Sequence, residues 1–189
     1  MLNELINTFE ELKENVYIID RGDLPPIIIK FKDEHFYHLI GLHKTNIDMF
    51  FPKKMFSKAK RYKYMKKNVN KFDNIIQNQT KGKFLLELRI STFKHITDML
   101  SEDSNANLYN LKQGAIGSVY DGDYGLLKIL QDSYCLLGLK EDVDNNVCHP
   151  QSWMASNRIN KLAKKPPIYY KRIIIIPKSI YENAEIYAI

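Results

Sequence analysis

The sequence predicts an α+β protein in which N-terminal helices are followed by an antiparallel β-sheet of about four strands. Before residue 101, several segments repeat apolar residues at the three- and four-residue spacing of a helix face. After residue 101, short apolar runs are separated by Gly, Asp and Asn turns, as in strands joined by hairpins. The 189 residues, 44% of them apolar, suit one domain over 1–189, with a helical and basic part (1–101) and a sheet part (102–189).

Periodicity and boundary residues define the elements of the first part. Asp33 is a good N-cap and Gly41 a good stop for a short helix between them. An apolar stripe marks the clearest helix, which starts at Phe84 and ends at Leu100. The predicted helices cover 2–15, 33–40, 52–67, 71–79 and 84–100, and predicted strands cover 16–19 and 27–31.

The second part reads as strands divided by turns. Predicted strands cover 108–111, 124–130, 134–139 and 168–176, and 147–153 is a candidate for a further short strand. Residues 148–153 lie where the sheet would turn. We interpret them as a loop anchored by Trp153, with Pro150 and Ser152 presenting a hydroxyl to a site as the alternative.

Positive charge is concentrated in one block. Residues 53–83 hold eleven Lys or Arg and one Asp, a net charge of +10, so the remainder of this +6 protein carries −4. Such a block favours a polyanionic partner, nucleic acid first. Within it, Lys58, Lys60, Arg61 and Lys63 are candidates for sequence-independent contacts to a phosphate backbone, and we expect them on the exposed face of the helix. The alternative is a solvated surface helix without a ligand.

Two histidines are the candidates for proton transfer. His38 and His43 stand among large apolar residues on either side of Gly41, and Lys44 follows them. Histidine changes charge near neutral pH, so a pair of them can supply a base and an acid. The alternative is a structural histidine that is satisfied within the core.

Arg89 lies in the middle of the apolar stripe of the helix over 84–100. A guanidinium that faces a core or a cleft needs a carboxylate, carbonyl groups or a bound phosphate. We therefore take Arg89 as a candidate phosphate ligand, with a structural ion pair as the alternative. Arg158 is a further candidate for holding phosphate, and Ser152 a candidate hydrogen-bond donor.

Several classes of site have no support in the sequence. Cys135, Cys148 and His149 lack the paired spacing of zinc ligands, and no Gly-rich loop is followed by Lys-Ser/Thr. We therefore expect no metal and no cofactor. No apolar run approaches the ~18 residues that a membrane span needs, and the N-terminal residues lack the apolar stretch of a secretory signal. Two cysteines make no disulfide framework, so we expect a cytoplasmic protein that does not contact membranes.

The chain resembles the phage-associated branch of the barnase–EndoU–colicin–RelE-like nuclease superfamily. The resemblance rests on three motifs: the His-Leu-x-Gly-Leu pattern within 36–44, Leu88-Arg89-Ile90 with Phe93, and the strand pair ending in Pro150-x-Ser152. It spans most of residues 16–176. It implies a RelE/barnase-like fold of helices followed by a four-stranded antiparallel sheet, and metal-independent ribonuclease activity, often in toxins of phages or mobile elements.

Residues and resemblance together predict a metal-independent endoribonuclease, a toxin or effector that cleaves RNA by attack of the 2′-OH. The expected catalytic residues are His38, His43, Lys44, Arg89 and Ser152. RNA is the expected partner, with a cognate antitoxin or inhibitor protein as a further candidate. The alternatives are a non-catalytic nucleic-acid-binding phage regulator or defence accessory protein, and a protein-interaction module without affinity for nucleic acid.

Overall fold

The computed structural model describes residues 1–52, 55, 57–80, 83–112, 122–131, 133–156 and 165–187. The side chains of Lys44, Leu85 and residues 185–187 are outside this description. The helices of the first part are α1 (Leu2–Lys13), α2 (Asp33–Leu39), the 3₁₀ turns η1 (Leu42–Lys44) and η2 (Ile47–Phe50), α3 (Lys58–Lys67), α4 (Val69–Gln77), α5 (Lys83–Thr92) and α6 (His95–Met99). A last helix, α7 (Lys178–Tyr187), was not predicted.

Seven strands form one sheet, in the order β3-β4-β5-β6-β2-β1-β7. They are β1 (Asn15–Arg21), β2 (Leu24–Lys30), β3 (Asn107–Asn110), β4 (Tyr124–Ile129), β5 (Tyr134–Asp142), β6 (Val147–Ser156) and β7 (Arg172–Pro177). The α+β class is confirmed, but the sheet is larger than the predicted four strands. It is also mixed, because β2 pairs with β6 in parallel while the other pairs are antiparallel.

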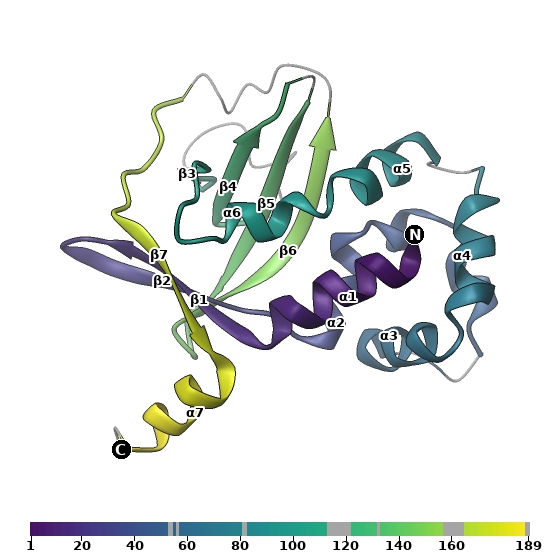
Figure 1. Cartoon of the computed structure of the whole chain (residues 1–189), viewed down its shortest axis with the longest axis horizontal. Helices are drawn as coiled ribbons and strands as arrows, with labels where there is room; N and C mark the ends of the chain where they lie inside the picture. Colours follow the sequence, from purple (N-terminus) through teal and green to yellow (C-terminus); the bar gives the residue numbers. More distant parts are fainter. Residues whose placement is uncertain are drawn as a thin grey trace.

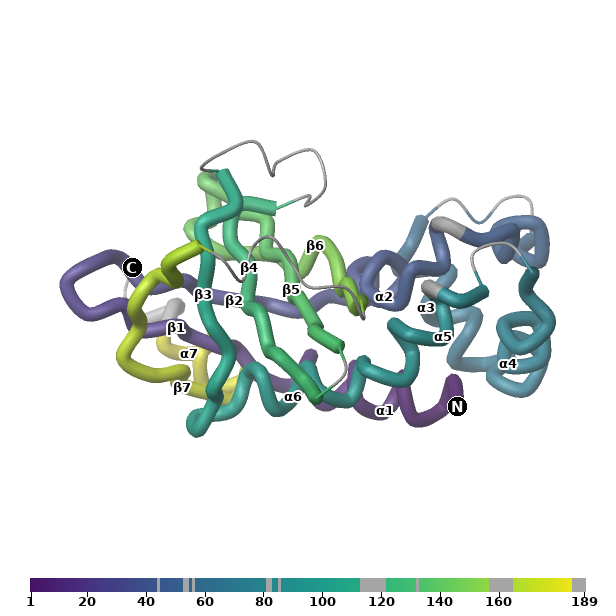
Figure 2. Tube along the Cα trace, turned by 90° about the horizontal axis from the view of Figure 1, so that it is seen from above, coloured from purple at the N-terminus to yellow at the C-terminus, as the bar shows by residue number. Residues whose placement is uncertain are grey.

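The sheet holds together parts of the chain that are distant in sequence. The β1–β2 hairpin is flanked by β7 on one side and by β6 on the other. Figure 1 shows α1 to α5 gathered at one end of the molecule, with the tip of the β1–β2 hairpin and α7 at the other. Seen from above in Figure 2, α2 lies next to β6, and this neighbourhood positions the site described below.

The core at the helical end is aromatic. The buried face of α1 consists of Leu2, Leu5, Ile6, Phe9 and Leu12. The ring of Phe9 contacts those of Phe31, Phe36 and Tyr62 at centroid distances of 5.1–6.1 Å. Tyr62 of α3 is fully buried, and its hydroxyl donates to Glu10 of α1. These contacts fix α2 between α1 and α3.

The predicted helix over 84–100 is broken into α5 and α6. The hydroxyl of Thr92 donates to the carbonyl of Leu88 at 2.6 Å, and the amide of Phe93 bonds to Ile90, three residues back. Such competition from a threonine side chain bends or ends a helix. Thr92 also accepts a hydrogen bond from the indole N–H of Trp153 at 3.3 Å, so α5 ends where it packs on β6.

Arg61 does not lie on the exposed face of the basic helix, contrary to expectation. Its side chain is only 18% exposed. The guanidinium donates to Asp48 Oδ1 and to the Met55 carbonyl, both at 2.9 Å, and lies over the rings of Tyr37 and Phe51. Arg61 therefore fastens α3 to the segment that follows α2.

We expect Arg61→Gln to lower the free energy of unfolding by about 1–3 kcal/mol, because charge-assisted hydrogen bonds are lost at a largely buried position. The matched control is Lys60→Gln on the neighbouring residue, which is exposed and should leave stability unchanged. Urea unfolding followed by fluorescence of Trp153 measures both. Equal midpoints for the two variants would show that the Arg61 contacts contribute nothing.

Candidate active site

The short helix α2 carries two histidines toward β6. Its first turn is closed by His35, whose Nδ1 accepts a hydrogen bond from the Lys32 backbone amide at 3.0 Å. The helix ends at Gly41, which has φ +80, a conformation that glycine adopts readily. The predicted helix with Gly41 as its stop is thus confirmed. His35 is buried and His38 half-buried, on the side of α2 that faces the sheet.

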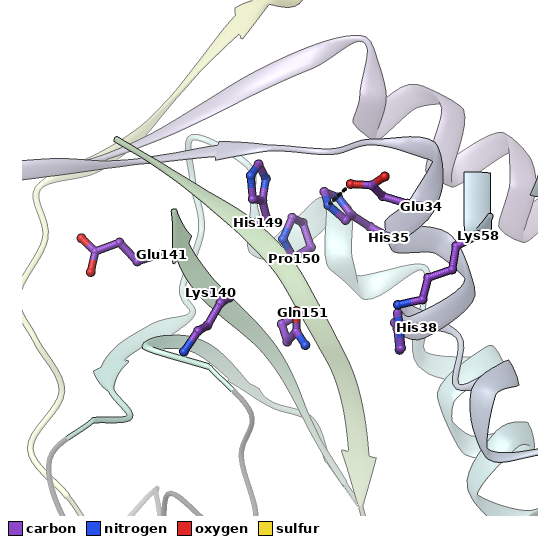
Figure 3. A pocket seen from close by; sticks show the side chains of 9 residues that line it. All are labelled: Glu34, His35, His38, Lys58, Lys140, Glu141, His149, Pro150 and Gln151. Atoms are coloured by element: carbon purple, nitrogen blue, oxygen red, sulfur yellow. Dashed lines mark ion pairs between the residues drawn. The ribbon is translucent and has the colours of Figure 1, made fainter. Parts of the chain in front are cut away.

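A pocket of about 490 Å³ lies between α2 and β6. It is lined by Glu34, His35 and His38 from α2, Lys58 from α3, Lys140 and Glu141 from β5, and His149, Pro150 and Gln151 from β6. In Figure 3 the side chains from α2 and Lys58 lie on one side of β6, and Lys140 and Glu141 lie on β5 on its other side. Of the predicted residues, the pocket brings together His38 and Lys58.

His149 is the functional candidate that our reading of the sequence missed. Its Nε2 lies 3.3 Å from Asp142 Oδ2, which also accepts from the Asn145 side chain at 2.8 Å. These hydrogen bonds, that of Asn145 first, lower the pKa of Asp142, so the carboxylate is ionised and Nε2 must be the donor. Nδ1 of His149 is buried and has no hydrogen-bond partner. Asp142 therefore fixes the ring at the pocket.

His35 and His149 face each other with ring centroids 5.3 Å apart. Burial, together with the charges of His149, Lys32, His38 and Lys58, lowers the pKa of His35 to about 3. His35 is therefore neutral near pH 7, so it is not an imidazolium that could donate a proton at that pH. Its role in the pocket is to cap α2 and to support the ring of His149.

His38 and His43 are brought together as predicted: their ring centroids are 4.6 Å apart. His43 is exposed and is not among the residues that line the pocket, so the pair joins the pocket to the surface beside η1. Lys44 follows in η1, and its side chain lies outside the description. Arg158 also lies outside the described residues.

Ser152 lies on the same face of the sheet as His149 because of a β-bulge. In the β5–β6 register, Lys140 pairs with His149 and Gly138 with Ser152, and the pairing shifts between Gly138 and Leu139. Residues 138 and 140 point to one face, so their partners do too. The interpretation of residues 148–153 as a loop is therefore wrong, although Trp153 is buried as expected. The Ser152 hydroxyl is buried without a hydrogen-bond partner.

Arg89 faces inward, as its place in the apolar stripe predicted, and is 7% exposed. Burial lowers its pKa. No described carboxylate lies within ion-pair distance of it, so the structural ion pair that was the alternative to a phosphate ligand is not found in the described part of the chain. Its guanidinium instead packs against Gly41, at the end of α2.

The remaining basic residues of α3 differ in their surroundings. Lys58 lines the pocket, and Lys60 is exposed. Lys63 lies 3.6 Å from Asp33, and Lys66 lies 3.0 Å from Glu10. Part of the positive block therefore neutralises acids of α1 and α2, and the positive charge left for a ligand is smaller than the sequence suggested.

The chain matches a family model over residues 2–187, nearly its whole length. The model is that of PBECR4, the phage-Barnase-EndoU-ColicinE5/D-RelE like nuclease 4. The protein belongs to this nuclease family. The resemblance proposed from the histidine, Arg89 and Pro150-x-Ser152 motifs is thereby confirmed. No curated protein and no solved structure matches the chain.

The described residues offer neither a metal-ligand cluster nor a membrane-spanning helix. No three His, Cys, Asp or Glu side chains among them are grouped so that they could hold a metal ion. None of the helices in that part of the chain has the length and apolar character required to cross a membrane.

The depressed pKa of His35 predicts acid sensitivity. The unfolded chain takes up a proton below pH 6.5, whereas the folded protein resists it down to about pH 3, so stability falls as pH drops through this window. We expect His35→Asn to remove this part of the loss, about 1.4 kcal/mol per pH unit, because the amide oxygen can still accept from Lys32 without titrating.

The measurement is urea unfolding between pH 7 and pH 4. Glu10, whose pKa is lowered to about 2 because hydrogen bonds from Tyr62, Lys13 and Lys66 outweigh the effect of burial, adds acid sensitivity of the same sign to both proteins. Only the difference in slope between wild type and variant reports His35. Parallel slopes would mean that His35 is already protonated in the folded state at pH 5.

Proposed function

We propose that this nuclease-family protein is a metal-independent endoribonuclease that cleaves RNA in the pocket between α2 and β6. One observation carries the proposal: histidines from α2 and β6 meet in a 490 Å³ pocket that also contains two lysines. Imidazoles transfer protons near neutral pH, and lysines stabilise phosphate charge. These are the groups that attack by a ribose 2′-OH requires.

The chemistry assigned to the pocket is a transesterification. One imidazole takes the proton of the 2′-OH, the 2′-oxygen attacks phosphorus, and a protonated imidazole gives its proton to the departing 5′-oxygen. His38 and His149 are the candidates, since His35 is held neutral. Lys58 and Lys140 lie at the same pocket and would stabilise the charge that develops on the phosphorane oxygens. The products are a 2′,3′-cyclic phosphate and a 5′-hydroxyl.

The family suggests a setting for this activity. A phage-associated ribonuclease that acts on cellular RNA would be a toxin or effector of a phage or mobile element, working in the cytoplasm and held in check by a cognate antitoxin or inhibitor protein. The competing function is RNA or DNA binding without cleavage, by a phage regulator or a defence accessory protein. It uses the same basic residues but requires no reactive histidine.

We expect purified protein to cut total RNA in the presence of EDTA and to leave 2′,3′-cyclic phosphate ends. His38→Ala and His149→Ala should each reduce kcat/KM by about 10²–10⁴, the usual contribution of one acid–base group. The matched control is His95→Ala, because His95 pairs with Asp98 on α6 and does not line the pocket. Cleavage that strictly requires Mg²⁺ overturns the mechanism, and RNA that is bound but intact favours the binding-only function.

We also expect the lysines of α3 to hold the RNA backbone. Replacing Lys58 and Lys60 together with Gln, with Lys63 kept because it pairs with Asp33, should weaken binding to all RNA sequences and reduce the log–log salt slope by about 1.4, at about 0.7 per single-strand phosphate contact. Arg61 stays unchanged because it supports the fold. Filter binding at several salt concentrations measures the slope. If the salt slope of RNA affinity is unchanged, these lysines do not contact the RNA backbone and contribute only to solubility or internal ion pairs.

A further inference from the structure

The buried guanidinium of Arg89 is the least explained charge in the described structure. Arg89 projects from α5, a helix that packs on β6 through Thr92 and Trp153. The residue is only 7% exposed, yet no described carboxylate pairs with it, and burial is the sole cause of its lowered pKa. By contrast, Arg61, the other largely buried arginine described, has both a carboxylate and a carbonyl.

The environment of Arg89 is formed by a turn that only glycine fits. A Cβ added to Gly41 would lie 2.6 Å from Nη1 and 3.0 Å from Cδ of Arg89, closer than side-chain atoms approach. Gly41 also has φ +80. The missing side chain thus lets the guanidinium lie against the backbone between His38 and His43, whose rings are in contact. His38 in turn lines the pocket.

An unpaired buried cation destabilises the folded protein, because desolvation costs free energy that no partner returns. Met or Leu at the same position on α5 would avoid this cost and fit the apolar stripe. The presence of a charge that lowers stability in the unliganded protein is explained if the guanidinium binds an anion, which supplies the missing partner. A guanidinium presents several N–H groups in one plane, a geometry that suits the oxygens of phosphate.

We propose that Arg89, lying against the Gly41 turn beside His38 and His43, forms a binding site for a phosphate group. Phosphate is favoured over a carboxylate because the planar N–H groups of Arg89 can bond two phosphate oxygens at once, and because His38, on the helix that the Gly41 turn ends, lines a pocket with Lys58. The inference rests on the proposed function for the source of the phosphate, an RNA strand whose ribose is attacked in the pocket. Binding of the anion itself requires no cleavage.

The test compares thermal unfolding of the whole protein in chloride, acetate and inorganic phosphate at equal ionic strength. Wild type should gain stability in phosphate, to saturation, and gain less in acetate. Arg89→Met should unfold at a temperature at least about 2 °C above wild type in chloride, because the unpaired charge is gone, and should show no phosphate-specific gain. Arg89→Lys keeps the charge but loses the planar fork, so its gain should be smaller than that of wild type.

The control is Arg172→Met, which removes an exposed arginine from β7 and should retain the full response to phosphate. Arg89→Met that is less stable than wild type in chloride, or that retains the phosphate gain, overturns the proposal. An equal gain in acetate overturns the assignment to phosphate. Gly41→Ala provides a second route, because the added methyl group displaces the guanidinium and should abolish the phosphate gain in protein that remains folded.

Cleavage assays separate this proposal from the proposed function. If both hold, Arg89→Met also reduces kcat/KM on RNA by about 100-fold, the loss typical of one group that stabilises transition-state charge. A phosphate gain that depends on Arg89, in a protein that never cuts RNA, supports the anion site and refutes the ribonuclease. If Arg89→Met cuts RNA with unchanged kcat/KM and wild type gains no stability in phosphate, the ribonuclease is supported and the anion site is refuted.

Discussion

The parallel pairing of β2 with β6, in which Ile29 lies opposite Cys148, is the constraint on which the candidate site depends. It joins the N-terminal hairpin to the C-terminal strands in one sheet. Since α2 begins at Asp33, soon after β2 ends, the pairing also sets α2 against β6. The histidines of α2 therefore meet His149 at a pocket that neither half of the chain forms alone.

Local signals in the sequence sufficed for the parts of this arrangement that depend on local structure. The stop of α2 at Gly41 and the inward direction of Arg89 follow from spacing and backbone preference, and both are observed, whereas the N-cap is Lys32, one residue before the predicted Asp33. Pairing between opposite ends of the chain has no such signal. For this reason the count of about four strands was too low, and the meeting of His35 with His149 was not foreseen.

Pro150 is the one signal that could have revealed the β6 site. We took the segment around it as a loop anchored by Trp153, because it lies where the sheet would turn, although 147–153 was also a candidate for a short strand. Proline is accepted at bulges, and the β5–β6 register shifts directly after Leu139 and Pro150 pair. A bulge turns a strand locally, so His149 and Ser152 share a face although they are three residues apart. Proline beside histidine in a strand-like run thus indicated a bulged strand at a site.

Charge is used in two different ways in this molecule. At Arg61, Lys63 and Lys66 the positive groups are paired with acids of the protein, and these pairs hold α3 to its neighbours. At Arg89 the positive group is buried without such a partner, and at the pocket Lys58 stands beside titratable rings, whereas Lys140 is paired with Asp123 at 3.4 Å. Internal pairs stabilise the fold regardless of ligand, whereas an unpaired cation lowers stability until an anion arrives. The distribution of unpaired charge, more than the net charge of +6, therefore locates the surface where a phosphate chain would bind.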